Sequence, residues 1–255
     1  MEVAEFETHE RLEATHWWFE GRRRCIAAVL DAHLTPRPQH DILDVGCGTG
    51  GMFPMLQRYG RVSGAEYAED ARERARRLFP DVEVAPCALP DELPDGTYSL
   101  VTAFDVLEHL DDAVASARAL ASRLIPGGQL VVTVPAFSFL WSAHDVWVHH
   151  KRRYTRGLLR AHLEGAGLKV TYDSYFNSAL FPAVAAARFA QRLLRRGVSE
   201  TGESNLAPVA APLNRLLTGI FGSERHLLGR ARQAVVGGEG EGGLSRQVVG
   251  VDHVE

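Results

Sequence analysis

The chain has 255 residues, and its 45% hydrophobic and 24% charged content is that of an ordinary globular protein with one large core. A formal net charge of −4 gives no reason to expect general nucleic-acid binding. The three cysteines, Cys25, Cys47 and Cys87, are scattered without the spacing of a metal site, which favours a reduced, cytoplasmic protein.

Residues 1–37 precede the first predicted strand and lack the hydrophobic run of a signal peptide. Within them, Trp17, Trp18 and Phe19 follow one another directly. Three adjacent side chains cannot all face one side of a helix, so at least one contacts something beyond the core of that helix. Two alternatives follow: a helix docked on the domain through Trp17 or Trp18, or a lid over cofactor and substrate. The arginines at 22–24 are compatible with a solvated face.

A glycine-rich loop follows the predicted strand 40–45 and leads into a predicted helix at 52–59. Gly46, Gly48 and Gly51 fit a G-x-G-x-x-G pattern, in which glycines permit positive φ and leave the backbone open to a ligand. Asp44 precedes the first glycine by two positions. Its carboxylate would repel a diphosphate but attract an ammonium and a sulfonium. The loop therefore indicates a site for S-adenosylmethionine rather than NAD.

The segment from Asp44 to Gly50 resembles the first motif of the class I S-adenosylmethionine-dependent methyltransferases. The similarity extends over 41–174 and is strongest at this loop, at 104–109 and at 124–135. The resemblance implies that the cofactor is bound by Asp44, Gly46, Cys47, Gly48, Gly50, Glu66, Tyr67, Ala88, Leu89 and Asp105. The acid that in the family follows the third strand is missing, so Ala88 and Leu89 would hold adenine through backbone and apolar contacts.

Further strands are predicted at 62–66, 82–85, 100–104, 129–134 and 168–174, and helices at 68–78, 112–124 and 156–164. This alternation predicts a doubly wound α/β domain with a mostly parallel sheet. The resemblance implies that the sheet is of the seven-stranded type, the Rossmann-like methyltransferase fold. Asp44, Glu66 and Asp105 end strands, so we expect three acids at the edge where ligands bind. Glu66 can accept both ribose hydroxyls of any nucleoside cofactor.

Catalytic residues are expected on two segments that follow the fourth and fifth strands. Methyl transfer from a sulfonium is an in-line displacement, so a base is needed only when the acceptor must lose a proton. His109 and His150 are the candidate bases, and Tyr154 and Arg153 would orient the acceptor or bind an anionic part of it. Relatives often carry a similar His-x-Arg-Arg-Tyr segment.

A metal site is the alternative for the same region. Asp105-x-x-Glu108-His109 resembles the Glu-x-x-Glu-His segment of small-RNA 2′-O-methyltransferases and some ubiquinone-pathway O-methyltransferases, which bind a divalent ion. His149 or His150 would supply a further ligand. The other interpretation is that Glu108 and His109 start a helix, whose dipole favours the acid. The prediction is a site without metal, with Asp105, Glu108 and His109 as the candidates otherwise.

The region after the core is predicted to be helical. The longest apolar stretch, 176–187, is shorter than the about 20 residues of a membrane span. Helices are expected at 179–196 and 207–221, as an added layer or dimer interface, a wall of the acceptor pocket, or an interfacial pair that reaches a lipid-linked substrate. The resemblance implies a seventh, antiparallel strand, for which 247–251 is the candidate.

The predicted organisation is therefore an N-terminal helical lid (1–37), a cofactor-binding core (38–175), a helical C-terminal addition (176–236) and a flexible tail (237–255). We expect methyl transfer from S-adenosylmethionine to an oxygen or nitrogen of a small molecule or glycoconjugate. Three alternatives remain. Asp44 opposes an NAD-dependent enzyme, the intact acidic edge opposes a non-catalytic cofactor-binding subunit, and the lack of a basic stripe opposes a nucleic-acid methyltransferase.

Overall fold

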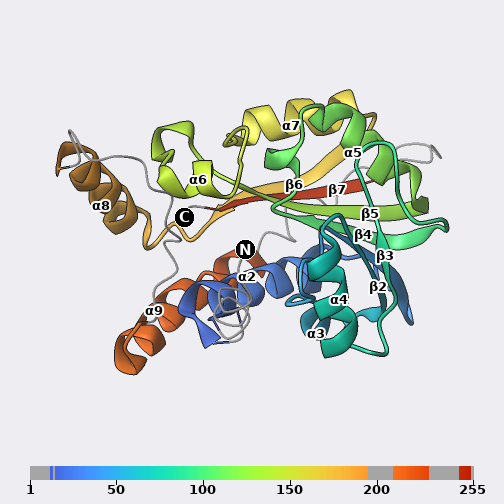
Figure 1. Cartoon of the computed structure of the whole chain (residues 1–255), viewed down its shortest axis with the longest axis horizontal. Coiled ribbons are helices and arrows are strands. Elements are labelled where there is room, and N and C mark those ends of the chain that lie inside the picture. Colours follow the sequence, from blue (N-terminus) through green and yellow to red (C-terminus); the bar gives the residue numbers. More distant parts are fainter. Residues whose placement is uncertain (1–11, 14, 195–208, 230–246, 254–255) are drawn as a thin grey trace.

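The computed structural model describes residues 12–13, 15–194, 209–229 and 247–253. Within these ranges seven strands form one sheet in the order β3-β2-β1-β4-β5-β7-β6, and every pairing is parallel (Figure 1). In chain order the strands are β1 (His40–Val45), β2 (Gly60–Glu66), β3 (Val84–Pro86), β4 (Tyr98–Phe104), β5 (Leu124–Pro135), β6 (Lys169–Phe176) and β7 (Gln247–His253). The predicted doubly wound, mostly parallel sheet is confirmed.

Helices cover both faces of this sheet. Figure 1 shows α5 and α7 over one face, with α2, α3, α4 and α9 on the other. The helices are α2 (Trp17–His33), α3 (Phe53–Leu56), α4 (Glu69–Leu78), α5 (Ala113–Ser122), α6 (Ala143–Trp147), α7 (Arg156–Gly165), α8 (Phe181–Leu194), α9 (Ala211–Ser223) and α10 (Arg225–Leu228).

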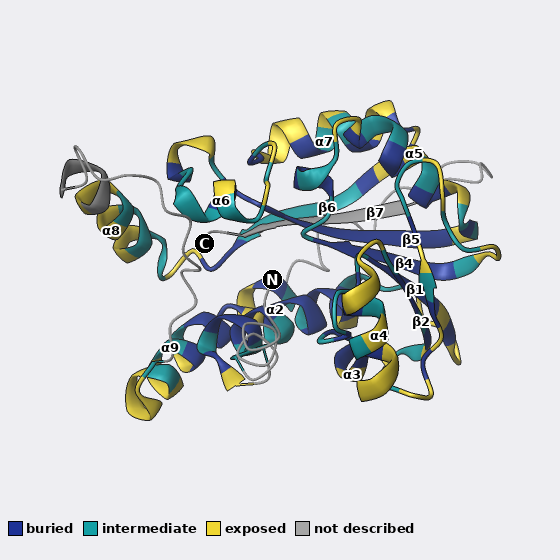
Figure 2. Cartoon of the chain, in the orientation of Figure 1, coloured by how far each residue is buried: buried dark blue, intermediate teal, exposed yellow. Residues whose placement is uncertain are grey.

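The two faces have separate hydrophobic cores because side chains alternate along each strand. Ile42 packs with the side chains of α2 and α3, whereas Leu43 and Val45 pack with those of α5 and α7. All three are buried, as is most of the sheet interior in Figure 2. A strand buried on both faces reads as a continuous apolar run, which is why β1 and β4 were recognisable in the sequence.

The strand order reverses beside β1. The chain runs outward from β1 through β2 to β3, and then returns to β4 on the other side of β1. In open parallel sheets, ligands bind outside the carboxyl ends of the strands at such a reversal. The topology therefore directs attention to the ends of β1 and β4.

The aromatic run at the start of α2 is anchored inside the protein. Trp18 and Phe19 are buried and meet edge to face, with ring centroids 5.0 Å apart. Trp17 meets Phe221 of α9 edge to face at 6.2 Å. Gly21 makes room for the same phenylalanine, since a Cβ there would lie 2.3 Å from Phe221 Cδ1. The helix is thus docked, and its partner includes the C-terminal addition.

The helical C-terminal addition is present as α8, α9 and α10. Asn214 of α9 accepts a hydrogen bond from Trp17 N at 2.8 Å and donates one to Thr15 O at 2.9 Å. α9 and α10 therefore close over the N-terminal helix. Along α8, the residues up to Ala190 are exposed or half-buried (Figure 2).

The flexible tail predicted over 237–255 is wrong for Gln247–His253, which forms β7 between β5 and β6. Residues 237–246 and 254–255 lie outside the described part of the chain. The predicted strand 247–251 falls within β7, but the antiparallel direction implied by the family is wrong, since β7 pairs in parallel with both neighbours. Its valine-rich sequence suits an interior strand, whereas the glycine-rich segment before it suggested mobility.

No helix in the described ranges is both long and apolar enough to cross a membrane. All three cysteines of the chain are buried thiols.

Candidate functional site

The glycine loop lies at the carboxyl end of β1 with its backbone open. Gly46 and Gly48 have φ of 70° and 54°, values that disfavour residues with a side chain. A Cβ at Gly46 would clash with Val106 at 2.4 Å, whereas a Cβ at Gly48 would meet nothing within 4 Å. The space above Gly48 is therefore the place where a ligand can approach the backbone.

Asp44 lies beneath this loop and is only 2% exposed. Its Oδ1 accepts a hydrogen bond from Thr102 Oγ1 at 2.6 Å. Burial raises the pKa of Asp44 to about 7, although Thr102 and Arg22 act in the opposite direction. A cation bound beside this carboxyl group would favour its ionised form.

Glu66 ends β2 and contacts the loop. Its carboxylate accepts hydrogen bonds from Gly48 N and Ala68 N, both at 2.9 Å. Each carboxylate oxygen has further acceptor capacity, so the hydroxyls of a ribose can still be bound. The predicted proximity of Glu66 to the loop holds in the structure.

Asp105 follows β4 in a left-handed conformation with φ of 58°. Its Oδ1 accepts a hydrogen bond from Thr133 Oγ1 at 2.8 Å, and its Oδ2 lies 2.5 Å from Arg22 Nη2. Arg22 extends from α2 and is 7% exposed. Its buried Nε has no hydrogen-bond partner among the described residues. Arg22 is a site residue that the sequence interpretation missed, because three adjacent arginines resemble a solvated face.

The remaining predicted cofactor residues differ in exposure. Cys47 is buried, and burial raises the pKa of its thiol far above the usual range, so it is an apolar neighbour of the loop. Ala88 pairs with Glu92 in a short antiparallel bridge beyond β3, and Leu89 is half-buried there. Tyr67 is 77% exposed. The glycine loop also contacts the segment before α2, since Thr49 Oγ1 donates a hydrogen bond to Glu13 Oε2 at 2.8 Å.

Two histidines meet where the predicted segments converge. The rings of His109 and His150 lie 4.8 Å apart between centroids, in an edge-to-face arrangement. Lys151 N donates to Glu108 O at 2.8 Å, which ties the two segments together. Burial, and then the neighbouring His150, lower the pKa of His109 to about 4, so its imidazole is neutral near pH 7.

His150 is oriented by a carboxylate. Its Nδ1 lies 2.9 Å from Asp145 Oδ1, and Arg153 pairs with the same carboxylate at 2.6 and 3.1 Å. An ionised carboxylate only accepts hydrogen bonds, so Nδ1 carries the proton and Nε2 keeps its lone pair in the neutral ring. Burial alone would raise the pKa of Asp145, but the bonds from His150 and Arg153 hold it well below its usual range.

Arg153 and Tyr154, which are predicted to orient the acceptor or bind an anionic part of it, both make their polar contacts within the protein. Both side chains are fully buried. Arg153 is paired with Asp145, and Tyr154 Oη donates to Leu107 O at 3.3 Å. Their role is to support the segment that carries His150. The sequence signal that could have drawn attention to Asp145 is the capping box at the start of α6. In this box Ser142 is the N-cap and Asp145 lies three residues later.

One group of metal-ligand type occurs among the described residues. The donor atoms of Glu108, His109 and His150 all lie within 4.8 Å of one another. Asp105 is directed to Arg22 and Thr133 and lies outside this group, whereas His150, one of the two further histidines of the metal alternative, belongs to it. A carboxylate with two imidazoles is a plausible donor set for a borderline divalent ion.

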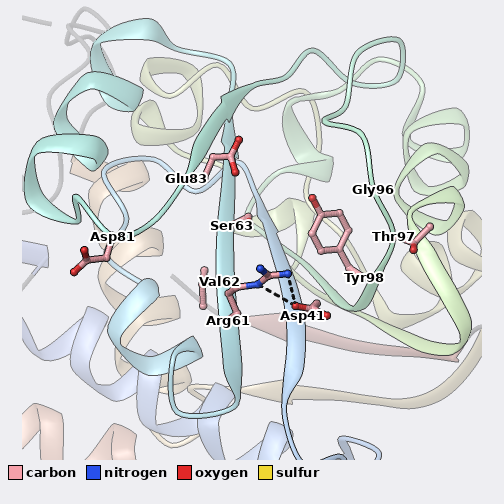
Figure 3. Close-up of a pocket in the computed structure, with 9 residues that line it drawn as sticks. All are labelled: Asp41, Arg61, Val62, Ser63, Asp81, Glu83, Gly96, Thr97 and Tyr98. Carbon is pink, nitrogen blue, oxygen red and sulfur yellow. Dashed lines mark hydrogen bonds and ion pairs between the residues drawn. The ribbon is translucent and has the colours of Figure 1, made fainter.

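A polar surface pocket, shown in Figure 3, lies elsewhere. It is lined at the amino ends of β1, β2 and β4, where Arg61 and Asp41 form an exposed ion pair. This edge is opposite to the carboxyl ends that carry Asp44 and Asp105. The pocket is therefore separate from the site described above.

Comparison with known proteins supports the same region. Residues 17–173, more than half of the chain, match the model of a family described as a methyltransferase domain. A probable S-adenosylmethionine-dependent methyltransferase of Mycobacterium tuberculosis is 32% identical over 127 residues, covering 49% of this chain and 44% of the relative. A ubiquinone biosynthesis O-methyltransferase of Albidiferax ferrireducens is 31% identical over 131 residues, covering 45% and 52%.

The chain thus spans about half the length of these curated relatives. Among solved structures, an S-adenosylmethionine-dependent methyltransferase from Clostridium acetobutylicum superposes with a TM-score of 0.53 at 14% identity. The match covers 69% of this chain and 93% of the other, and at this identity it supports the fold alone.

Proposed function

Because the chain belongs to the class I S-adenosylmethionine-dependent methyltransferases, we propose that it transfers a methyl group to an oxygen or nitrogen of a small-molecule or glycoconjugate acceptor. The observation that carries this proposal is one edge of the sheet. There, Asp44, Glu66 and Asp105 lie by an open glycine loop, and His109 and His150 meet after β4 and β5. The O-methyltransferase named among the relatives favours an oxygen acceptor.

The residues at this edge fit the cofactor. Its sulfonium is an activated methyl donor when bound, so the protein chiefly binds and aligns. Asp44 and Asp105 offer carboxylates to an ammonium, Glu66 offers one to ribose hydroxyls, and Gly48 leaves the backbone open. The positive charge of Arg22 favours the ionised form of Asp44. Its buried Nε could donate a hydrogen bond to the carboxylate of the methionine moiety.

His150 is the better placed of the two candidate bases. Asp145 fixes its tautomer, so Nε2 is free of a proton and can accept one from an acceptor hydroxyl. When bound, the cofactor would supply the activated methyl group, and His150 would hold the proton that the acceptor oxygen loses as it is methylated. His109 contributes a neutral imidazole beside it.

Calorimetric titration with S-adenosylmethionine and, separately, NAD tests the cofactor. The wild type is expected to bind the first alone, and Asp44→Asn to bind it at least about tenfold more weakly, a loss of about 1.4 kcal/mol. Asp41→Asn is the matched control, since Asp41 lies at the opposite end of β1 in an exposed ion pair. Binding of NAD, or equal behaviour of the two variants, contradicts the proposal.

A second candidate is metal-assisted O-methylation, favoured by the cluster of Glu108, His109 and His150. These side chains would hold a divalent ion, which could position an acceptor hydroxyl and lower its pKa. Asp145 would then orient His150 from behind, as carboxylates commonly do for metal-ligating histidines.

Acceptor turnover with and without chelator separates the two mechanisms. If the histidines act as bases, a chelator leaves the rate unchanged and His150→Gln lowers it by about 10²-fold or more. If a metal is used, the chelator abolishes turnover, Mg²⁺ or Mn²⁺ restores it, and Glu108→Gln no longer binds the ion in calorimetry. His162→Gln on α7 is the control in both cases.

A further inference from the structure

Aromatic rings gather at the carboxyl ends of β5 and β6. Phe137 lies between Tyr175 and Phe139, with ring centroids 4.8 and 5.4 Å away and interplanar angles of 29° and 27°. We call these three stacked rings the aromatic stack. Phe181, the first residue of α8, meets Phe137 at 5.5 Å and the edge of Phe139 at 6.2 Å. The stack is thus held on one side by the C-terminal addition.

The backbone at the centre of the stack is unusual. Phe137 has a φ of 62°, in the left-handed region that disfavours bulky residues. Its N donates to Tyr154 O at 2.8 Å, and its O accepts from Leu140 N at 2.9 Å. Backbone strain of this kind persists where surrounding contacts fix it, and it occurs often at ligand sites.

One end of the stack faces solvent. Phe139 is 56% exposed, whereas Phe137 and Tyr175 pack against the buried side chains of Ala136 and Leu140. Packing alone would favour covering this ring, because an exposed phenylalanine forgoes most of its hydrophobic stabilisation. The outer ring is therefore available to a ligand.

The stack and His150 share one scaffold. Ala136, the residue before Phe137, forms a parallel bridge with Tyr154, and its O accepts from Arg153 Nη1 at 3.2 Å. Arg153 in turn pairs with Asp145, which orients His150. The aromatic stack and the candidate base thus belong to one hydrogen-bonded unit at the carboxyl edge of the sheet.

This arrangement selects among acceptors. A flat apolar ring gains offset stacking on an exposed phenylalanine. An aromatic hydroxyl has a pKa of about 10, far below the roughly 15.7 of water, so it gives up its proton more readily than an alcohol does when its oxygen is methylated. Both properties are combined in a phenol.

Resting on the proposed function, we propose that the aromatic stack recognises the acceptor, and that the acceptor is a small phenol whose ring lies against Phe139.

Calorimetric titration of the full chain with 2-naphthol, in the presence of S-adenosylhomocysteine, tests this proposal. The wild type is expected to bind 2-naphthol, Phe139→Ala to bind it about fivefold more weakly, and Phe139→Tyr to retain the affinity. Phe189→Ala is the matched control, because Phe189 on α8 is also exposed, at 65%, but is not part of the stack. It is expected to bind like the wild type.

Three results overturn the inference: no binding of 2-naphthol to the wild type, equal loss in the two alanine variants, or tighter binding of methyl β-glucopyranoside than of 2-naphthol. Titration with S-adenosylmethionine is run on the same samples. Failure to bind that cofactor contradicts the proposed function itself, whereas normal cofactor binding with any of the three results contradicts the phenol inference alone.

Discussion

Burial strongly changes the pKa of the Asp44 carboxyl group. It lies under the glycine loop, 2% exposed, with one hydrogen bond from Thr102. Burial raises its pKa to about 7, so the ligand-free protein holds a proton there that the unfolded chain would release near pH 4. As pH rises from about 4 to about 7, the unfolded state loses this proton first, and ionisation of Asp44 therefore lowers the stability of the ligand-free protein.

Cofactor binding should show the opposite dependence on pH. If the ammonium of S-adenosylmethionine binds the ionised carboxylate, affinity increases about fivefold from pH 6 to pH 7, given a pKa of about 7. Thr102→Val removes the hydrogen bond that favours ionisation, so it should shift this dependence to higher pH. Titrations in buffers of different ionisation enthalpy would detect the released proton, and a flat profile would contradict this assignment.

The buried ion pair of Asp145 and Arg153 gives a second prediction for single residues. Asp145→Asn removes the charge that pairs with the buried Arg153, and the expected loss of unfolding free energy is about 3 kcal/mol. Denaturant unfolding measures this loss. The double variant Asp145→Asn, Arg153→Met should recover part of the stability. Additive losses would show that the two residues are not coupled.

Much of the site could be predicted from residues that end strands. Asp44, Glu66 and Asp105 were identifiable because apolar runs precede them, and parallel strands bring their carboxyl ends to one edge. The ion pair of Arg153 could not be predicted, because local sequence does not reveal that Asp145 pairs with the arginine from eight residues away. The role of Arg22 could not be predicted either, since its partner Asp105 follows a strand that is distant in sequence.

At the scale of elements, a close fit joins α2 to α9. Gly21 faces Phe221, and Cys25 Sγ donates a hydrogen bond to Phe221 O at 3.6 Å. Phe221 also stacks on Phe176 at the end of β6, with centroids 5.8 Å apart. α2 and α9 therefore share one buried ring, which also contacts the end of β6.

Replacing a glycine by alanine should have opposite effects on the unfolding free energy in α2 and in α9. Gly21→Ala would place a methyl group 2.3 Å from Phe221, so unfolding free energy should fall by about 1–3 kcal/mol. Gly219→Ala on α9 meets nothing within 4 Å and should raise it by up to about 1 kcal/mol. Thermal unfolding of the two variants compares them directly. Equal shifts would mean that the α2–α9 fit contributes little.

For the whole molecule, the direction and order of the strands could be predicted where strands and helices alternate. They could be predicted less well in the C-terminal region, where this alternation ends. Apart from β3 and β4, the successive strands up to residue 176 are separated by helices, which favours their parallel direction. β7 comes after α8, α9 and a glycine-rich stretch, so nothing local indicated its place between β5 and β6. Its direction depends on pairing with two distant strands and cannot be derived from its own seven residues.

Removal of residues 247–255 should therefore affect the protein as a whole. Among the described strands β6 pairs with β7 alone, so the truncated chain would leave β6 without that neighbour and β5 with an open edge. We expect loss of cooperative thermal unfolding and aggregation at micromolar concentration. A truncated protein that unfolds cooperatively near the wild-type temperature would show that β7 is dispensable.

The position of β7 also has a consequence for synthesis on the ribosome. β6 is complete at residue 176, but the strand that joins it to the sheet begins at residue 247. At a synthesis rate of about 5–20 residues per second, several seconds pass between the synthesis of β6 and that of β7. During this time β5 and β6 have unpaired edges. The sheet therefore cannot close before Gln247–His253 has emerged, and nascent chains arrested before Gln247 should be cleaved by protease within 169–176. The synthesis of β7 thus determines when the edges of β5 and β6 are protected from aggregation.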